Sequence, residues 1–257
     1  MILAIDIGNS NIVIGCIDGE KPLFVERIAT DRKKTDLEYA LQFRSILELN
    51  EVDASSLEGG ILSSVVPPLT AAVRNSAERI LGKKILTVGP GLKTGLNIAI
   101  DNPAQLGSDQ VVDAVAAIAC YKAPLIVIDM GTATTMSAID STGKYLGGAI
   151  IPGLRVALDS LTSQTSQLPN ISLEAPPHVI GTNTVDCMQS GAILGNASLL
   201  DGMIDRIQEE LGETCTVVAT GGLVPFVIPH CRHDIIGDDD LLLKGLWILY
   251  KKNTKAH

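Results

Sequence analysis

The sequence contains no stretch of about 18 uninterrupted apolar residues, the length that a helix needs to cross a bilayer. No basic segment precedes the apolar run Met1–Ile5, and Asp6 ends that run. A secretory signal peptide would carry a basic segment followed by a longer apolar one. We therefore expect no membrane association and a cytoplasmic location.

Paired cysteines and an excess of basic residues are also missing. The five cysteines are scattered without a CxxC pair, which favours reduced, buried thiols over disulfides or a zinc site. The chain has 29 acidic and 20 basic residues, a net charge of −9. Sequence-independent binding to nucleic acid needs a basic face that replaces the phosphate counterions, so we expect no nucleic-acid partner.

The chain does contain enough apolar material for a large core. Hydrophobic residues make up 46% of its 257 residues, and the length suits one large domain or two small ones. Strand and helix patterns alternate, which predicts an α/β fold. A capping box, Thr35 with Glu38, opens a helix that should end near Leu49 and bury Leu37, Ala40, Leu41 and Leu47.

One passage of the sequence occurs twice, 123 residues apart. The run Ile5-Asp6-Ile7-Gly8-Asn9-Ser10-Asn11 resembles the run Ile128-Asp129-Met130-Gly131-Thr132-Ala133-Thr134. Each has a strand that ends in Asp, then a glycine turn with small polar residues, then a second strand. Self-similarity at half the chain length predicts two similarly folded lobes, residues 1–120 and 121–257.

The paired turns suit phosphate chemistry. A glycine turn lets backbone N–H groups approach an anion, and hydroxyl or amide side chains add donors. An Asp just before the turn would repel phosphate directly, but it could hold a cation that bridges to the phosphates. One such turn alone is equally typical of an ordinary polar hairpin; the pair favours a grip on a triphosphate.

Two further segments could carry chemistry. Asp109, in Leu106-Gly107-Ser108-Asp109-Gln110, stands where a helix begins, so it could be a helix cap or a general base for phosphoryl transfer. The run Thr220-Gly221-Gly222 follows an apolar strand, where glycines allow a flat ligand or a second backbone to lie close.

Taken together, these motifs resemble type III pantothenate kinases along essentially the whole chain. The resemblance includes the paired turns, the helix start at Asp109 and several collinear runs: 31–35, 63–68, 89–97, 181–191 and 242–246. The family belongs to the superfamily of acetate and sugar kinases, heat-shock proteins and actin. The resemblance therefore implies two ribonuclease-H-like lobes with mixed sheets flanked by helices, and a nucleotide cleft between them.

The resemblance also assigns roles to individual residues. It implies that Asp109 is the catalytic base, that Asp129 holds a monovalent cation (K⁺ or NH₄⁺), and that Thr132 contacts the nucleotide. The first phosphate-binding loop would consist of Asp6, Ile7, Gly8, Asn9, Ser10, Asn11, Ile12 and Val13. The pantothenate site would include Ile100, Gly107, Ser108, Asp109, Gln110 and Thr184.

The implied activity is the ATP- and Mg²⁺-dependent phosphorylation of pantothenate to 4′-phosphopantothenate, the first step of coenzyme A biosynthesis, by a homodimer. The chain departs from the family at Gln110, where Arg is usual, and at Ile100, where Tyr is usual. Gln cannot supply the charge or the bidentate clamp of Arg. Two alternatives therefore stay open: a related kinase for another hydroxyl acceptor, and a catalytically silent paralogue that binds nucleotide.

Overall fold

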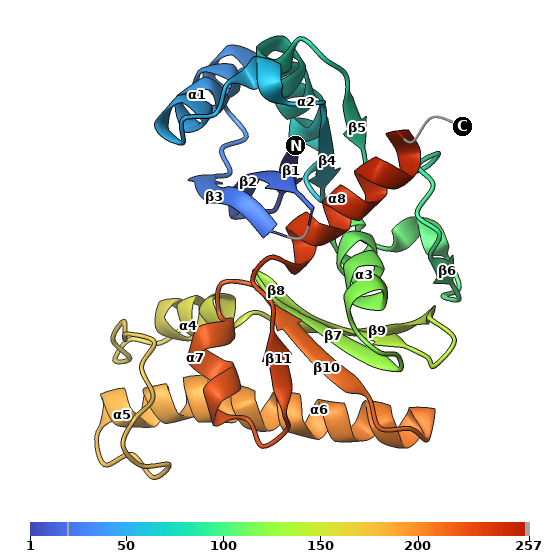
Figure 1. Ribbon diagram of the computed structural model, residues 1–257. Coiled ribbons are helices and arrows are strands. Elements are labelled where there is room, and N and C mark those ends of the chain that lie inside the picture. The colour runs from blue at the N-terminus through green and yellow to red at the C-terminus, as the bar shows by residue number, and fades with distance from the viewer. Residues whose placement is uncertain (20, 255–257) are drawn as a thin grey trace. The chain divides into compact units, whose positions relative to one another are not determined.

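The computed structural model describes residues 1–19 and 21–254, which divide into two compact α/β units (Figure 1). Unit 1 contains residues 1–96, 101–119 and the described part of the C-terminal segment from Asp240, and unit 2 contains residues 97–100 and 120–239. The chain leaves unit 1 next to the boundary expected at residue 120. The chain returns to unit 1 at its end, however, so the last helix belongs to unit 1 and not to the lobe expected for residues 121–257.

The sheet of unit 1 has the strand order β3-β2-β1-β4-β5, in which β1 lies antiparallel to β2 and parallel to β4. Its strands are β1 (Ile2–Ile7), β2 (Asn11–Asp18), β3 (Lys21–Ala29), β4 (Gly60–Ser64) and β5 (Ile85–Thr87). Its helices are α1 (Asp36–Leu49), α2 (Pro67–Leu81), α3 (Ser108–Cys120) and α8 (Leu241–Thr254), with short 3₁₀ turns at Ala54–Ser56 and Pro103–Gln105.

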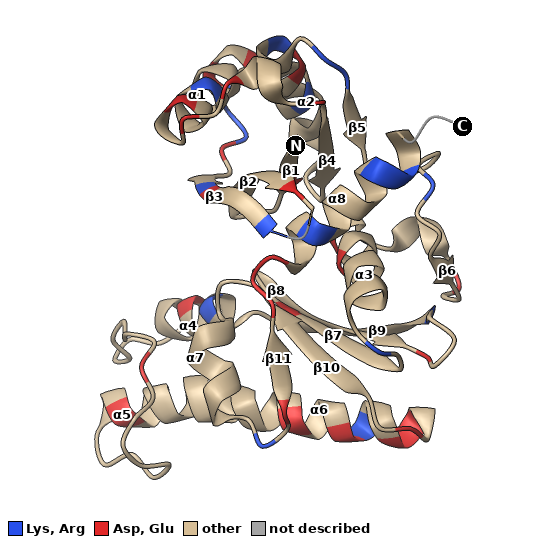
Figure 2. Ribbon diagram, viewed as in Figure 1, with Lys and Arg blue, Asp and Glu red and all other residues tan. Residues whose placement is uncertain are grey.

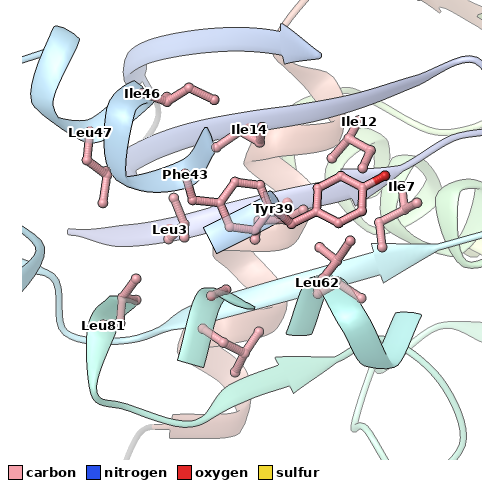
Figure 3. Packing of buried hydrophobic residues seen from close by; sticks show 14 of the residues in the cluster. Leu3, Ile7, Ile12, Ile14, Tyr39, Phe43, Ile46, Leu47, Leu62 and Leu81 are labelled. Carbon is pink, nitrogen blue, oxygen red and sulfur yellow. The ribbon is translucent and has the colours of Figure 1, made fainter. Parts of the chain in front are cut away.

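Helices cover both faces of this sheet because successive residues of β1 point to opposite sides. Leu3 and Ile7 belong to one cluster with Tyr39 and Phe43 of α1, as Figure 3 shows. Ile2 belongs to a second cluster, which includes apolar side chains of α3 and α8. The three layers explain why every residue of β1 is buried.

Helix α1 begins at the predicted capping box and ends at the predicted Leu49. The Thr35 hydroxyl accepts a hydrogen bond from the backbone N–H of Glu38, and the Glu38 carboxylate accepts one from the N–H of Thr35. The predicted buried face is wrong in part, because Leu37 and Leu41 are 51% and 55% exposed. The buried face of α1 instead contains two aromatic side chains and three aliphatic ones: Tyr39, Phe43, Ala40, Ile46 and Leu47.

The sheet of unit 2 has the strand order β11-β10-β7-β8-β9-β6. Its strands are β6 (Asn97–Ile98), β7 (Leu125–Met130), β8 (Ala133–Ile139), β9 (Lys144–Pro152), β10 (Thr216–Thr220) and β11 (Ile235–Gly237). Its helices are α4 (Leu154–Ser163), α5 (Thr184–Gln189), α6 (Gly195–Leu211) and α7 (Val224–Val227), with a π-helical turn at Ser190–Leu194 and a 3₁₀ turn at Ile228–His230. One sheet face packs against α4, α6 and α7.

The internal repeat is visible in the strand pairing of the two units. Asp6 in β1 pairs with Val13 in β2 and with Ser63 in β4. Asp129 in β7 pairs correspondingly with Thr135 in β8 and Thr220 in β10. Both sheets therefore contain an antiparallel three-strand meander joined to a parallel strand, and each aspartate occupies the equivalent place. The prediction of α/β units with mixed sheets flanked by helices is confirmed.

Charged residues of both signs appear on the surface helices of each unit, for example on α1 and on α6 (Figure 2). Across residues 1–19 and 21–254, no helix is both long and apolar enough to cross a membrane.

Candidate active site

The turn between β1 and β2 is the first predicted phosphate-binding element; we call residues 8–10 loop 1. The backbone N–H of Gly8 donates to the carbonyl oxygen of Asn11 over 3.0 Å and closes the turn. A Cβ at residue 8 would lie 3.0 Å from that same oxygen, so glycine avoids a crowded contact. Asn9, Ser10 and Asn11 are exposed. Their side chains and the backbone of the turn can therefore face a ligand.

Thr30, which sequence analysis missed, anchors loop 1 from the end of β3. Its hydroxyl donates to the carbonyl oxygen of Gly8 over 2.7 Å, and its backbone N–H donates to the carbonyl oxygen of Ser10 over 3.0 Å. No local pattern marks Thr30 in the sequence, because its partners lie about 20 residues away and are backbone atoms.

Three of the predicted loop residues have hydrophobic side chains that cannot act as polar ligands. Ile7 and Ile12 are fully buried in the hydrophobic cluster between the unit 1 sheet and α1, and they lie near Tyr39 (Figure 3). Val13 is half-buried and pairs with Asp6. These residues can contribute to a phosphate site only through the backbone, while their side chains hold the turn on the core.

Serine residues link the strand beside Asp6 to the start of α3, where Asp109 lies. Asp6 ends β1 beside Ser63 of the neighbouring strand β4. The Ser63 hydroxyl donates to the hydroxyl of Ser108, the first residue of α3, over 3.0 Å. Asp109 follows directly. The fold thus places the start of α3 at the strand ends from which loop 1 also departs.

The surroundings of Asp109 change its acidity. Burial raises the pKa of this carboxyl above its ordinary value, although the backbone N–H of Gln110 donates to its Oδ1 over 2.8 Å and opposes that shift. A carboxylate with a raised pKa accepts a proton more readily than a solvated one. A raised pKa is a property that suits a general base at this position.

The second turn, between β7 and β8, belongs to unit 2. The backbone N–H of Gly131 donates to the carbonyl oxygen of Ala133 over 3.1 Å, and Thr132 is exposed at the tip. The turn is one residue shorter than loop 1, because Asp129 pairs with the residue six places on whereas Asp6 pairs with the residue seven places on.

The glycines after β10 bring a second backbone close to Asp129. A Cβ at Gly221 would lie 2.8 Å from the Asp129 carboxylate and 2.7 Å from the carbonyl oxygen of Met130. Gly222, in contrast, faces open space. The sequence predicted that these glycines let either a flat ligand or a second backbone lie close. At Gly221 it is a second backbone that lies close.

Thr184 begins α5 in unit 2 and is exposed. It lines a pocket of about 700 Å³ whose walls come from α4, the segment 181–184, α5 and the start of α6. The lining is mainly apolar, with Leu154, Leu158 and Met188 among its side chains.

The predicted substrate residues therefore fall into two groups. Gly107, Ser108, Asp109 and Gln110 lie together at the start of α3 in unit 1. Ile100 and Thr184 lie in unit 2, where a Cβ at Gly147 of β9 would lie 3.7 Å from the Ile100 side chain. Within the described residues, no three His, Cys, Asp or Glu side chains gather as a metal cluster.

Comparison with known proteins identifies close relatives of this chain. The sequence profile of the type III pantothenate kinase family matches residues 2–206. Type III pantothenate kinases from Exiguobacterium sp. strain AT1b and Moorella thermoacetica are 44% and 43% identical over 255 and 254 residues, covering 99% of this chain and 100% of each relative.

The fold also matches solved structures. A conserved protein from Campylobacter jejuni, provisionally assigned to the Baf family of transcriptional activators, superposes with a TM-score of 0.60. It is 21% identical in sequence, and the match covers 99% of this chain and 100% of the other. At that identity the likeness concerns the fold, which is the one shared by actin-like ATPases and sugar kinases.

Proposed function

The chain belongs to the type III pantothenate kinase family, and we propose that it phosphorylates pantothenate with ATP to give 4′-phosphopantothenate and ADP. This reaction is the first step of coenzyme A biosynthesis. The observation that carries the mechanism is the half-buried Asp109 carboxylate, with its raised pKa, beside the strand ends that lead into loop 1.

The chemical step is an in-line transfer. The primary hydroxyl oxygen of pantothenate attacks the γ-phosphorus, a new O–P bond forms, and the bond from the γ-phosphorus to the bridging β,γ-oxygen breaks. Asp109 accepts the hydroxyl proton, and ADP leaves with the bridging oxygen. Burial raises the pKa of Asp109, which suits a group that takes up this proton.

Loop 1 would hold phosphate oxygens through its backbone N–H groups and the side chains of Asn9 and Ser10, and Asn11 at the start of β2 would add its side chain. Thr132 would contribute a further nucleotide contact from unit 2. Each role is supported by an exposed polar side chain on a turn whose backbone is fixed by hydrogen bonds. Such turns supply anion-binding N–H groups without a net positive charge.

Two cations complete the proposal. Asp6 would hold Mg²⁺ by way of its water shell, since Mg²⁺ in kinase sites uses one or two carboxylates together with substrate phosphates. Asp129 would bind K⁺ or NH₄⁺. The nearby carbonyl oxygen of Met130 is the type of oxygen ligand that hard cations prefer. When bound, these cations neutralise charge on the phosphates.

Pantothenate would contact Gly107, Asp109 and Gln110 at the start of α3, together with Ile100 and Thr184. Gln110 lacks the fixed charge of the Arg usual in the family. A charge-assisted contact is typically worth about 1.5–3 kcal/mol, so the loss predicts weak pantothenate binding. We place the enzyme in the cytoplasm as a homodimer, as the family resemblance implies.

The test is a coupled assay of ADP release with pantothenate, with and without K⁺, on the wild type, Asp109→Asn and Gln110→Arg. We expect pantothenate-dependent turnover that needs K⁺, no turnover in Asp109→Asn, and a lower KM for pantothenate in Gln110→Arg. Near-normal turnover by Asp109→Asn would contradict the assignment of the base. If the wild type ignores pantothenate but turns over ATP with another small alcohol, the acceptor assignment is wrong.

A further inference from the structure

We propose that Ser63 and Ser108 form a hydroxyl latch that positions Asp109, and that Ser108 serves the fold of the site and does not contact the substrate. The role of Asp109 rests on the proposed function, whereas the latch itself is a property of unit 1. Its members come from two segments that lie 45 residues apart in the sequence.

The latch consists of three hydrogen bonds at one oxygen atom. Ser108 Oγ donates to the carbonyl oxygen of Ser64 over 2.9 Å. It accepts from the backbone N–H of Ser64 over 3.0 Å and from the Ser63 hydroxyl over 3.0 Å. A serine hydroxyl has one hydrogen to donate and two lone pairs that accept. These three bonds use its whole capacity, so no bond remains for a substrate.

Ser63 is an unusual residue to find at this place in a core strand. Its side chain is 0% exposed, and it lies between the layers of unit 1. A buried hydroxyl without a partner would lose its hydrogen bonds to water without replacement. The bond to Ser108 supplies that partner, so removal of the Ser108 hydroxyl leaves both Ser63 Oγ and the Ser64 N–H unsatisfied.

The latch fixes a geometry that matters for transfer. Strand β4 is paired directly with β1, so Ser63 lies beside Asp6, and the latch ties the first residue of α3 to β4. Asp109 follows that first residue. The position of the proposed base relative to the end of β1 is thus set by one short chain of hydrogen bonds. Displacements of about 1 Å in such groups cost large factors in rate.

The test compares Ser63→Ala, Ser108→Ala, their double variant and Ser108→Thr, which keeps the hydroxyl. Ser76→Ala is the matched control, because Ser76 is a buried serine of unit 1 whose hydroxyl bonds to carbonyl oxygens of Asp36 and Ala72. The readouts are kcat, the KM values for ATP and for pantothenate, and hydrogen exchange of the amides in the first turns of α3. All variants keep the charge of the wild type.

We expect kcat to fall about 3- to 10-fold in Ser108→Ala, the range for loss of neutral hydrogen bonds, with the KM for ATP unchanged. Ser63→Ala should have a smaller effect, and the double variant should be no worse than Ser108→Ala, since the two hydroxyls act as a pair. Amide exchange at the start of α3 should rise in these variants. It should stay at the wild-type level in Ser76→Ala and Ser108→Thr.

Two results would overturn the latch. One is unchanged exchange at the start of α3 in Ser108→Ala; the other is a rise in the KM for pantothenate with kcat unchanged, which would make Ser108 a substrate contact. The exchange measurement needs no turnover. A wild type that fails to phosphorylate pantothenate would therefore count against the proposed function alone.

Discussion

The proton affinity of a half-buried carboxylate at a helix start depends on two opposing effects, loss of water and hydrogen bonds from backbone N–H groups. In Asp109, removal from water outweighs the hydrogen bond from the Gln110 N–H, and the pKa of the carboxyl is raised. The folded protein therefore binds a proton at this site more tightly than the unfolded chain does. The ionised form is therefore disfavoured in the folded protein, so at a pH above the raised pKa the carboxylate costs stability.

Asp109→Asn should consequently raise the unfolding temperature at pH 7 while it abolishes turnover. The gain should shrink as the pH falls through the raised pKa of the folded carboxyl and be absent below its ordinary value of about 3.9, because the wild-type carboxyl is then neutral in both states. Thermal unfolding monitored by circular dichroism from pH 3.5 to 7 measures this. Asp159→Asn, at an exposed position on α4, should show no such gain. A lower unfolding temperature for Asp109→Asn at pH 7 would contradict the burial cost.

Among the elements, loop 1 shows how a short turn is held in one conformation. The carbonyl oxygen of Ile7 accepts from the backbone N–H of Val65, so the chain is anchored just before the turn. Thr30, the residue after β3, adds two bonds to the carbonyl oxygens of Gly8 and Ser10. A turn anchored from both sides can present its N–H groups to phosphate without being ordered at the moment of binding.

Thr30→Val removes the hydroxyl bond to Gly8 and keeps the size and the backbone bond. We expect the KM for ATP to rise about 3- to 10-fold, as for loss of one neutral hydrogen bond, with kcat changed less than 2-fold. Steady-state kinetics measure both. Thr254→Val, whose hydroxyl bonds within α8, serves as the control and should leave the KM for ATP unchanged. Equal changes in the two variants would refute a specific role of Thr30.

For the molecule as a whole, the end of the chain completes the domain formed by its beginning. Helix α8 packs on one face of the unit 1 sheet, with Leu243, Leu246 and Leu249 buried there. Glu58 joins the two ends electrostatically, because its carboxylate accepts hydrogen bonds from the N-terminal ammonium group and from Lys251 of α8. These contacts lower the pKa of Glu58 to about 2.

Glu58→Gln should therefore destabilise the protein at pH 7. The lowered pKa means that this contribution is fully present above the unfolded value of about 4.3 and is lost as the pH falls towards 2. Glu58 and Lys251 are 50% and 31% exposed, so the loss should stay below about 1 kcal/mol. Chemical denaturation at pH 7 and pH 3 measures it. Glu48→Gln, in the exposed pair with Arg44, should lose less at pH 7, and an equal loss would contradict the prediction.

Local patterns in the sequence determined where α1 begins, that two related sheets form, and which family the protein belongs to. The capping box placed the start of α1 correctly, since its bonds join residues three apart. The repeated Asp-x-Gly turns predicted two related sheets, and the strand pairing at Asp6 and Asp129 confirms them. The motifs as a set also identified the family, which full-length relatives confirm.

Only the tertiary structure decided which distant residues meet. The buried stripe of α1 depends on how the helix is rotated against the sheet, so Leu37 and Leu41 could not be told from Tyr39 and Phe43 by periodicity. Thr30 reaches loop 1, Ser108 reaches Ser63, and α8 reaches the first sheet through contacts across 22, 45 and more residues. Such contacts arise from the packing of whole elements, and no spacing within a single segment encodes them.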